Sequence, residues 1–284
     1  MIVLDKLMNY RIPEVRQVLG PKDASLYALC VGLGQDPMDE RQLEYVDYQR
    51  CTRAMPSQAL VAAHPHFWMA APETGIDARQ LVHGEQGLIL HRPMPVQGEL
   101  VGRTRIEGVV DKGEGKGALL YWSKTLFDAA TDEPVATAES TTFLRADGGF
   151  GGPSGPVRAP DPVPDSPPDA IVELATRTEQ ALFYRLNGDY NPLHANPAAA
   201  RRAGFPRPIL HGLCTFGVVC HALLRAVCDY DAARLRTMRL RFTAPVVPGE
   251  TIRTEVWKSG AFRARVVERN AVVVDNGSFA MVAG

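Results

Sequence analysis

A segment rich in proline and glycine divides this chain. Residues 147–169 carry seven prolines and five glycines, a composition that neither a helix nor a central strand accommodates. The segment therefore predicts an ordered or semi-stiff linker. It separates a first half, residues 1–146, from a second half, residues 170–284, and each half has the size of a common domain.

The two halves resemble each other. Residues 26–33 are similar to 182–189 at an offset of 156, and 96–99 are similar to 247–250 at an offset of 151. A short helix in each half is followed by strand-like runs: 87–92, 100–110, 118–127 and 136–145, then 235–244, 251–259, 263–269 and 271–281. Hairpin-length turns such as 258–260 and 275–277 favour antiparallel sheets. One long helix per half beside such a sheet predicts the α+β class.

A carboxylate, an amide and an imidazole fall within six residues of the second half, at Asp189, Asn191 and His194. Gly188 is a typical left-handed end for a short helix that starts near residue 178. Pro192 then prevents one continuous helix through the three polar residues. We call residues 189–194 the hook, and we expect it to aim side chains at a cavity.

Two helices are expected after the hook. Asn196 and Pro197 are typical first residues of a helix that ends at Gly204. A long apolar helix follows over residues 213–227, and Gly212 precedes it. A helix start without a side chain offers free N–H groups and a positive dipole end to a ligand oxygen.

Two interpretations of the hook compete. Asp189 and Asn191 are also common turn residues that bond their own backbone, with His194 as a satisfied histidine. An acid, an imidazole and backbone donors together instead suit acid/base chemistry beside a carbonyl.

The residues of the hook and of the following helix carry a family resemblance. Gly188-Asp-x-Asn-Pro-Leu-His194, followed by Ala203-Gly-Phe-x-x-Pro-Ile-Leu-His-Gly-Leu-Cys-Thr-Phe-Gly217, closely resembles the signature of the (R)-specific enoyl-CoA hydratases. These are the type 2 hydratases of the MaoC-like group, whose two-hotdog form includes the hydratase 2 domain of peroxisomal multifunctional enzyme type 2. The resemblance implies a double hotdog, in which two antiparallel sheets each wrap a central helix.

That resemblance implies a reaction and its catalytic residues. Water adds reversibly and syn across a trans-2-enoyl-CoA to give a (3R)-3-hydroxyacyl-CoA, in fatty-acid metabolism or β-oxidation. Asp189 takes a proton from the water, while His194 holds the same water and assists protonation at C2. The N–H of Gly212 stabilises the enolate oxygen, and Asn191 orients the water or the hook. His211 is as easily a capping residue, and we assign it no role.

The resemblance also implies substrate contacts in both halves. Lys112 is expected at the CoA phosphates as a point charge, although its glycine-rich surroundings alone predict a hairpin turn. Phe242 alternates with Leu240 along a strand, so core packing competes with a place in the substrate site. The predicted substrate-binding set is His83, Gly84, Lys112, Tyr190, Pro192, Leu193 and Phe242.

The first half lacks the hook. Leu33 stands at the position equivalent to Asp189, and no Asn-Pro-x-His follows it. We therefore expect residues 1–146 to form a non-catalytic hotdog that covers the acyl pocket, and residues 170–284 to form the catalytic one.

Other functions remain open at this point. A hotdog thioesterase would release free CoA, a dehydratase would act on acyl carrier protein, and a non-catalytic module would only bind acyl-CoA. A metal at His64-x-His66 has no carboxylate or cysteine cluster to complete it, so no metal and no cofactor beyond the CoA of the substrate are expected.

Composition limits the partners and the compartment. A net charge of −1 gives no general attraction to nucleic acid or to anionic membranes. Residues 1–6 lack the pattern of a signal peptide, and residues 281–284 are not a peroxisomal address. The five cysteines form no CxxC pair and are expected to be reduced and buried. We expect a cytoplasmic enzyme, as a monomer of two folds or a homodimer.

Overall fold

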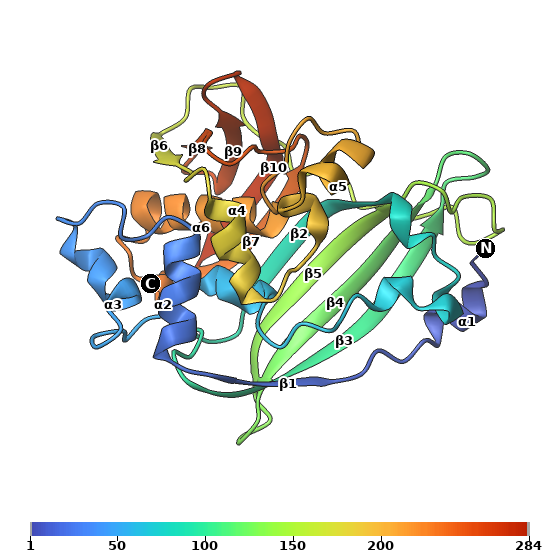
Figure 1. Ribbon diagram of the computed structural model, residues 1–284, viewed down its shortest axis with the longest axis horizontal. Helices are drawn as coiled ribbons and strands as arrows, with labels where there is room; N and C mark the ends of the chain where they lie inside the picture. The colour runs from blue at the N-terminus through green and yellow to red at the C-terminus, as the bar shows by residue number, and fades with distance from the viewer. Residues whose placement is uncertain (1, 283–284) are drawn as a thin grey trace.

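The computed structural model describes residues 2–282. The strands of this part of the chain form one continuous antiparallel sheet of ten strands, which curves across both halves (Figure 1). No helix within residues 2–282 is both long and apolar enough to cross a membrane. The predicted α+β class is confirmed.

The first half contributes five strands and short helices. Its strands are β1 (Val15–Leu19), β2 (Leu81–Leu90), β3 (Gly98–Asp111), β4 (Ala118–Asp128) and β5 (Pro134–Leu144). Its helices are α1 (Leu4–Met8), α2 (Pro21–Cys30) and α3 (Leu43–Val46), with 3₁₀ turns η1 (Glu40–Gln42), η2 (Pro56–Leu60), η3 (Trp68–Ala70), η4 (Pro72–Thr74) and η5 (Ala78–Gln80).

The second half repeats this plan around a longer helix. Its strands are β6 (Ala170–Ala175), β7 (Leu235–Phe242), β8 (Thr251–Val256), β9 (Ala261–Val266) and β10 (Ala271–Met281). Its helices are α4 (Gln180–Tyr184), α5 (Pro197–Arg202) and α6 (Gly212–Val227), with η6 (Arg185–Asn187), η7 (Pro192–His194) and η8 (Ala232–Arg234). The predicted ends of the helices before and after the hook agree with α4–η6 and α5.

Strand order reveals the internal symmetry. The sheet runs β1-β3-β4-β5-β2-β7-β10-β9-β8-β6, so each half has the same order read outward from the seam between β2 and β7. Each half is thus a five-stranded hotdog, and the seam joins them into the expected double hotdog. Sequence patterns identified eight of these strands but missed β1 and β6 at the two edges.

The central helices of the two halves differ. Apolar α6 is almost wholly buried against the second-half sheet, whereas the equivalent residues of the first half, 56–71 at the offset of 156, form only the 3₁₀ turns η2 and η3. The expected long helix of the first half is therefore wrong. The buried Lys124 ammonium donates to the carbonyls of Leu60 and Ala62, at 3.1 and 2.5 Å, and satisfies the end of η2.

One predicted turn is a bulge instead. Residues 275–277 lie inside β10, where the pairing shifts register against both neighbouring strands. Asn276 has φ of 52°, and a Cβ on Gly277 would stand 2.4 Å from the Phe262 ring. Asn-Gly supplies positive φ and close approach to a bulge as readily as to a hairpin. The turn at 258–260 does join β8 to β9.

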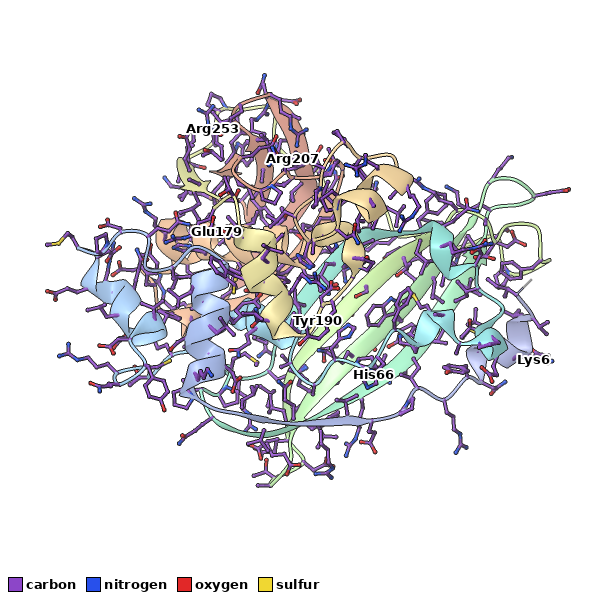
Figure 2. All side chains as sticks on the ribbon, in the orientation of Figure 1. Lys6, His66, Glu179, Tyr190, Arg207 and Arg253 are labelled. Carbon is purple, nitrogen blue, oxygen red and sulfur yellow. The ribbon has the colours of Figure 1, made fainter. Side chains whose placement is uncertain are left out.

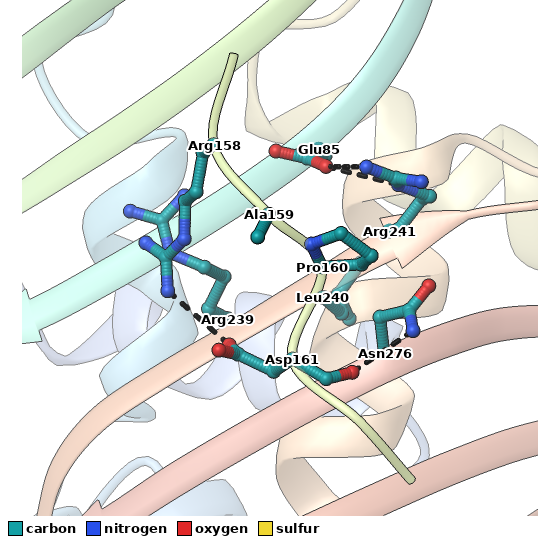
Figure 3. Close-up of a pocket in the computed structure, with 9 residues that line it drawn as sticks. All are labelled: Glu85, Arg158, Ala159, Pro160, Asp161, Arg239, Leu240, Arg241 and Asn276. Atoms are coloured by element: carbon teal, nitrogen blue, oxygen red, sulfur yellow. Dashed lines mark hydrogen bonds and ion pairs between the residues drawn. The ribbon is translucent and has the colours of Figure 1, made fainter. Parts of the chain in front are cut away.

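The proline-rich segment crosses the outer face of the seam (Figure 3). No helix or strand occurs between β5 and β6. Arg241 pairs with Glu85 at 2.5 Å and Arg239 pairs with Glu139, which ties β7 to the first half. Asp161 pairs with Arg158 and accepts from Ser278 at 2.7 Å. Acidic partners thus compensate these arginines, and the recess beneath the segment measures only 10 Å³.

Candidate active site

Local hydrogen bonds build the hook. Gly188 ends η6 with φ of 108°, a conformation that favours glycine. The Asp189 side chain accepts from the N–H of Asn191 at 3.1 Å, and the Asn191 side chain accepts from the N–H of Leu193 at 3.0 Å. Asn191 is therefore the N-cap of η7, which is the turn role that the sequence left open.

His194 ends η7 and is buried. Its Nδ1 lies 2.8 Å from the carbonyl oxygen of Ile209. Because a carbonyl can only accept, Nδ1 carries the proton, and in the neutral ring Nε2 is an acceptor. Burial lowers the pKa of His194, and the Asp189 carboxylate opposes part of that shift. The ring is neutral at pH 7, with a bare nitrogen.

The ring of His211 packs against the ring of His194. It is 1% exposed, and its ring stacks on the His194 ring with centroids 3.8 Å apart and planes 28° apart. Its Nε2 lies 3.3 Å from the backbone oxygen of Asp189. The sequence had left this residue without a role.

Asp189, His194 and His211 form one cluster. Their carboxylate and ring nitrogens lie within 4.8 Å of one another. Three such ligands could hold a metal ion, but no other histidine, cysteine or acid among residues 2–282 completes the set. A carboxylate beside a neutral imidazole also suits proton transfer from water. The expectation of a site without metal stays a prediction.

The start of α6 faces an aromatic wall. A Cβ on Gly212 would stand 3.5 Å from the Phe242 ring, and that ring lies 4.9 Å from the ring of His83. The first N–H groups of α6 have no partner within the helix. Gly212, Phe242 and His83 thus come together from α6, β7 and β2, although they are far apart in sequence.

Two histidines of the first half, His83 and His64, lie near the hook. Burial lowers the pKa of each ring to about 4, and the negative charge of Asp189 opposes the shift at both. His83 donates to the side-chain oxygen of Gln86 at 3.1 Å. His64 keeps accessible surface although protein surrounds it, and it lies 6.0 Å from the Trp122 ring. His64 therefore lies close enough to Asp189 to interact with its charge, although the sequence assigned it no place beside Asp189.

Four more of the predicted substrate-binding residues lie on the hook or beside His83 on β2. Tyr190 is 65% exposed and lies below α4, in front of the first-half strands (Figure 2); Pro192 and Leu193 form η7 beside it. Gly84 lies at a register shift of β2, where a Cβ would stand 3.2 Å from the Thr141 oxygen. All four lie on the hook or on the strand that carries His83.

Lys112 is not brought to the hook. Its ammonium lies 5.2 Å over the Phe143 ring. Phe143 points to the opposite face of β5 from Thr142, whose side chain accepts from Trp122 inside the first half. Lys112 therefore lies on the outer face, and its contact with CoA stays a prediction.

The sequence held weak signals for the two residues it missed. His211 immediately precedes the glycine that starts α6, which is the N-cap position. His64 was considered only as half of a metal motif. Neither pattern tells which side chain a folded chain will place against Asp189, because the partners lie more than 20 residues away.

Two five-stranded halves form one curved antiparallel sheet, and an acid and an imidazole lie at the start of α6. This arrangement defines a double-hotdog protein with a site suited to acid/base chemistry. Two family models match the chain: the MaoC like domain over residues 160–280 and the MFE-2 hydratase 2 N-terminal domain over residues 19–146. Together they span both hotdogs.

Individual proteins agree along nearly the whole chain. The 3-hydroxyacyl-thioester dehydratase Y of Mycobacterium tuberculosis is 39% identical over 93% of each chain. The peroxisomal enoyl-CoA hydratase 2 of Arabidopsis thaliana is 34% identical over 95% of this chain and 93% of its own. A crystal structure of a MaoC-like dehydratase from Phytophthora capsici matches with a TM-score of 0.85 and 33% identity over 99% of both chains. This chain belongs to the MaoC-like, type 2 enoyl-CoA hydratase family, and the predicted resemblance is confirmed.

Proposed function

We propose that this protein adds water reversibly to a trans-2-enoyl-CoA and forms a (3R)-3-hydroxyacyl-CoA in fatty-acid metabolism. The observation that carries the proposal is the pairing of Asp189 with a neutral, buried His194 beside the free N–H groups of α6. The hydratase and dehydratase relatives support the same chemistry in its two directions.

The tautomer of His194 suggests how the water is held. Nδ1 is committed to Ile209, so Nε2 and the Asp189 carboxylate both accept hydrogen bonds from one water. With both of its hydrogens engaged, that water turns a lone pair toward C3. Asp189 then takes the proton as the C3–O bond forms.

The second half of the reaction returns that proton. Addition at C3 moves the alkene electrons to the thioester oxygen as an enolate, which the N–H of Gly212 stabilises. Neutral His194 has no proton to give at Nε2, so the proton taken from the water returns to C2 from the Asp189–His194 pair. Both additions occur on one face, and no proton is gained or lost overall.

The acyl group lies beside Asp189 in this proposal. Phe242, His83 and His64 lie around it and come from both hotdogs, which gives the first half its purpose. The CoA portion stays outside, near Tyr190. Because no cofactor takes part in the steps above, none is proposed.

The thioester carrier and the compartment are further proposals. CoA is favoured by the enoyl-CoA hydratase relative, whereas the printed name of the mycobacterial relative specifies only a thioester. We propose a cytoplasmic location from the sequence, although the plant relative is peroxisomal by name. A homodimer of double hotdogs is likewise proposed.

Hydration of crotonyl-CoA and of a long-chain trans-2-enoyl-CoA, with chiral analysis of the product, tests the function. We expect an R product, and a loss of about 10²–10⁴-fold in kcat for Asp189→Asn and for His194→Gln. Glu179→Gln removes one charge at the start of α4 and serves as the matched control with wild-type rate. Release of free CoA without hydration would support a thioesterase, and tight binding without turnover would support a binding module.

A further inference from the structure

We propose that His211 is a positioning residue that holds Asp189, His194 and the start of α6 in one arrangement. Its ring stacks on His194 at 3.8 Å, its Nε2–H donates to the backbone oxygen of Asp189 at 3.3 Å, and its own carbonyl accepts from Thr215 to begin α6. The side chain thus contacts both Asp189 and His194, and the backbone of the same residue begins α6. The kinetic readout rests on the proposed function, whereas these contacts do not.

The hydrogen bond to Asp189 acts on the backbone rather than on the carboxylate. Asp189 follows Gly188 in a turn with few other restraints, since its side chain bonds only the N–H of Asn191 among the described contacts. A hydrogen bond that fixes the carbonyl of Asp189 also fixes the orientation of the backbone there. It therefore fixes the direction in which the Asp189 side chain points. Small displacements of such a group cost large factors in rate.

The stack acts on His194. The ring of His211 covers one face of His194 and keeps water from it, while the bond to Ile209 holds its edge. The groups that face the two rings are the Asp189 carboxylate, the Arg185 guanidinium and the Tyr184 ring, which lies 5.0 Å from His211. Burial, followed by the neighbouring His194, lowers the pKa of His211 to about 3. His211 therefore stays neutral at pH 7.

A role in packing alone does not explain why residue 211 is a histidine. Nδ1 of His211 is buried without a hydrogen-bond partner in the protein, and an unsatisfied buried acceptor is destabilising. An aromatic ring without nitrogen would fill the same space without that cost. Retaining an imidazole is explained if its other nitrogen, Nε2, is needed at Asp189.

Two substitutions separate the two contacts. His211→Phe keeps a ring against His194 but removes the donor, and His211→Gln keeps a donor but removes the ring. We expect kcat to fall about 100-fold in His211→Phe with little change in KM, and to recover at least in part in His211→Gln. The matched control is His221→Gln, a buried histidine on the same helix outside the site, with wild-type kcat.

The second readout does not need a substrate. Titration of His194 by histidine side-chain NMR should give a pKa near that of wild type in His211→Phe and a higher one in His211→Gln, because water then reaches the ring. In the separate activity assay, the acid limb of the pH profile of kcat/KM should shift in the same direction as the pKa of His194. Thermal unfolding of each variant measures the folded fraction used to normalise the rates.

The outcomes are distinct. Wild-type kcat in His211→Phe, or an unmoved His194 titration in His211→Gln, would overturn the positioning role and leave His211 as a helix cap. A wild-type protein that hydrates no enoyl-CoA would instead overturn the proposed function, while the NMR titration would still decide whether His211 controls His194.

Discussion

At the scale of single residues, backbone carbonyls determine how the acid and the imidazole are presented. The carbonyl of Ile209 selects the tautomer of His194, and the carbonyl of Asp189 accepts from His211. Asn191, expected to orient the water or the hook, caps η7, and its contact with the water stays a prediction. The chemistry of the hook therefore depends on groups that every residue carries, which a sequence motif does not display.

Gly212 provides a prediction at this scale. Gly212→Ala should fold normally, because the added methyl would stand 3.5 Å from the Phe242 ring, an ordinary contact distance. The methyl would nonetheless enter the space between α6 and Phe242 where the thioester oxygen is proposed to lie. We expect kcat/KM to fall about tenfold or more, with an unchanged midpoint of thermal unfolding. Wild-type kinetics in this variant would argue against the helix start as the oxyanion site.

At the scale of elements, the two halves differ in the central helix. Residues 212–227 are apolar and uninterrupted and form α6, whereas in the first half Pro65 follows five residues after the end of η2. Proline removes a backbone donor and ends the helix there. Lys124 then satisfies the last carbonyls of η2. His64 therefore lies in the loop between η2 and η3 rather than inside a long helix.

Close packing of α6 provides the second prediction. A Cβ on Gly217 would stand 2.4 Å from Val31 Cγ1 and 3.1 Å from the Tyr27 hydroxyl. Gly217→Ala should therefore lower the free energy of unfolding by about 1–3 kcal/mol, despite the better helix propensity of alanine.

Urea unfolding monitored by circular dichroism measures this change. Activity per folded molecule should stay at the wild-type value, since Gly217 lies a turn beyond the site. Gly212→Ala is the natural comparison on the same helix, with the opposite pattern of effects. An equally stable Gly217→Ala protein would show that α2 and α6 do not pack as closely as described.

At the scale of the whole molecule, buried neutral histidines connect stability to pH. Burial lowers the pKa of His221 from 6.5 to about 4, and its ring donates to the Val31 carbonyl and accepts from Tyr230 at 3.2 Å each. The unfolded chain therefore binds more protons than the folded one between these two pH values. Stability is complete above pH 6.5 and falls as the pH drops toward 4.

The size of this effect provides the third prediction. His221 alone should account for about 3 kcal/mol of stability lost between pH 7 and pH 4, and His83 and His211 add to it with the same sign. Urea unfolding at a series of pH values should show the decline, with a shallower slope in His221→Gln. Stability independent of pH over this range would mean that the buried rings are protonated in the folded state.

The features that were predicted correctly from the sequence are local. Proline and glycine placed the linker and the helix ends, alternation placed eight strands, and the motif from Gly188 to His194 together with residues 203–217 identified the family. These features depend on interactions between residues close in the chain, so they can be recognised without the fold.

The features that the sequence did not predict are contacts between groups that are distant in the chain. The stacking of His211 on His194, the approach of His83 and His64 to Asp189, and the placement of Lys112 on the outer face all join or separate residues from different elements. The edge strands β1 and β6 and the bulge in β10 also depend on their sheet neighbours. Such contacts follow from how whole elements pack, and packing depends on every side chain at the interface rather than on any one stretch of sequence.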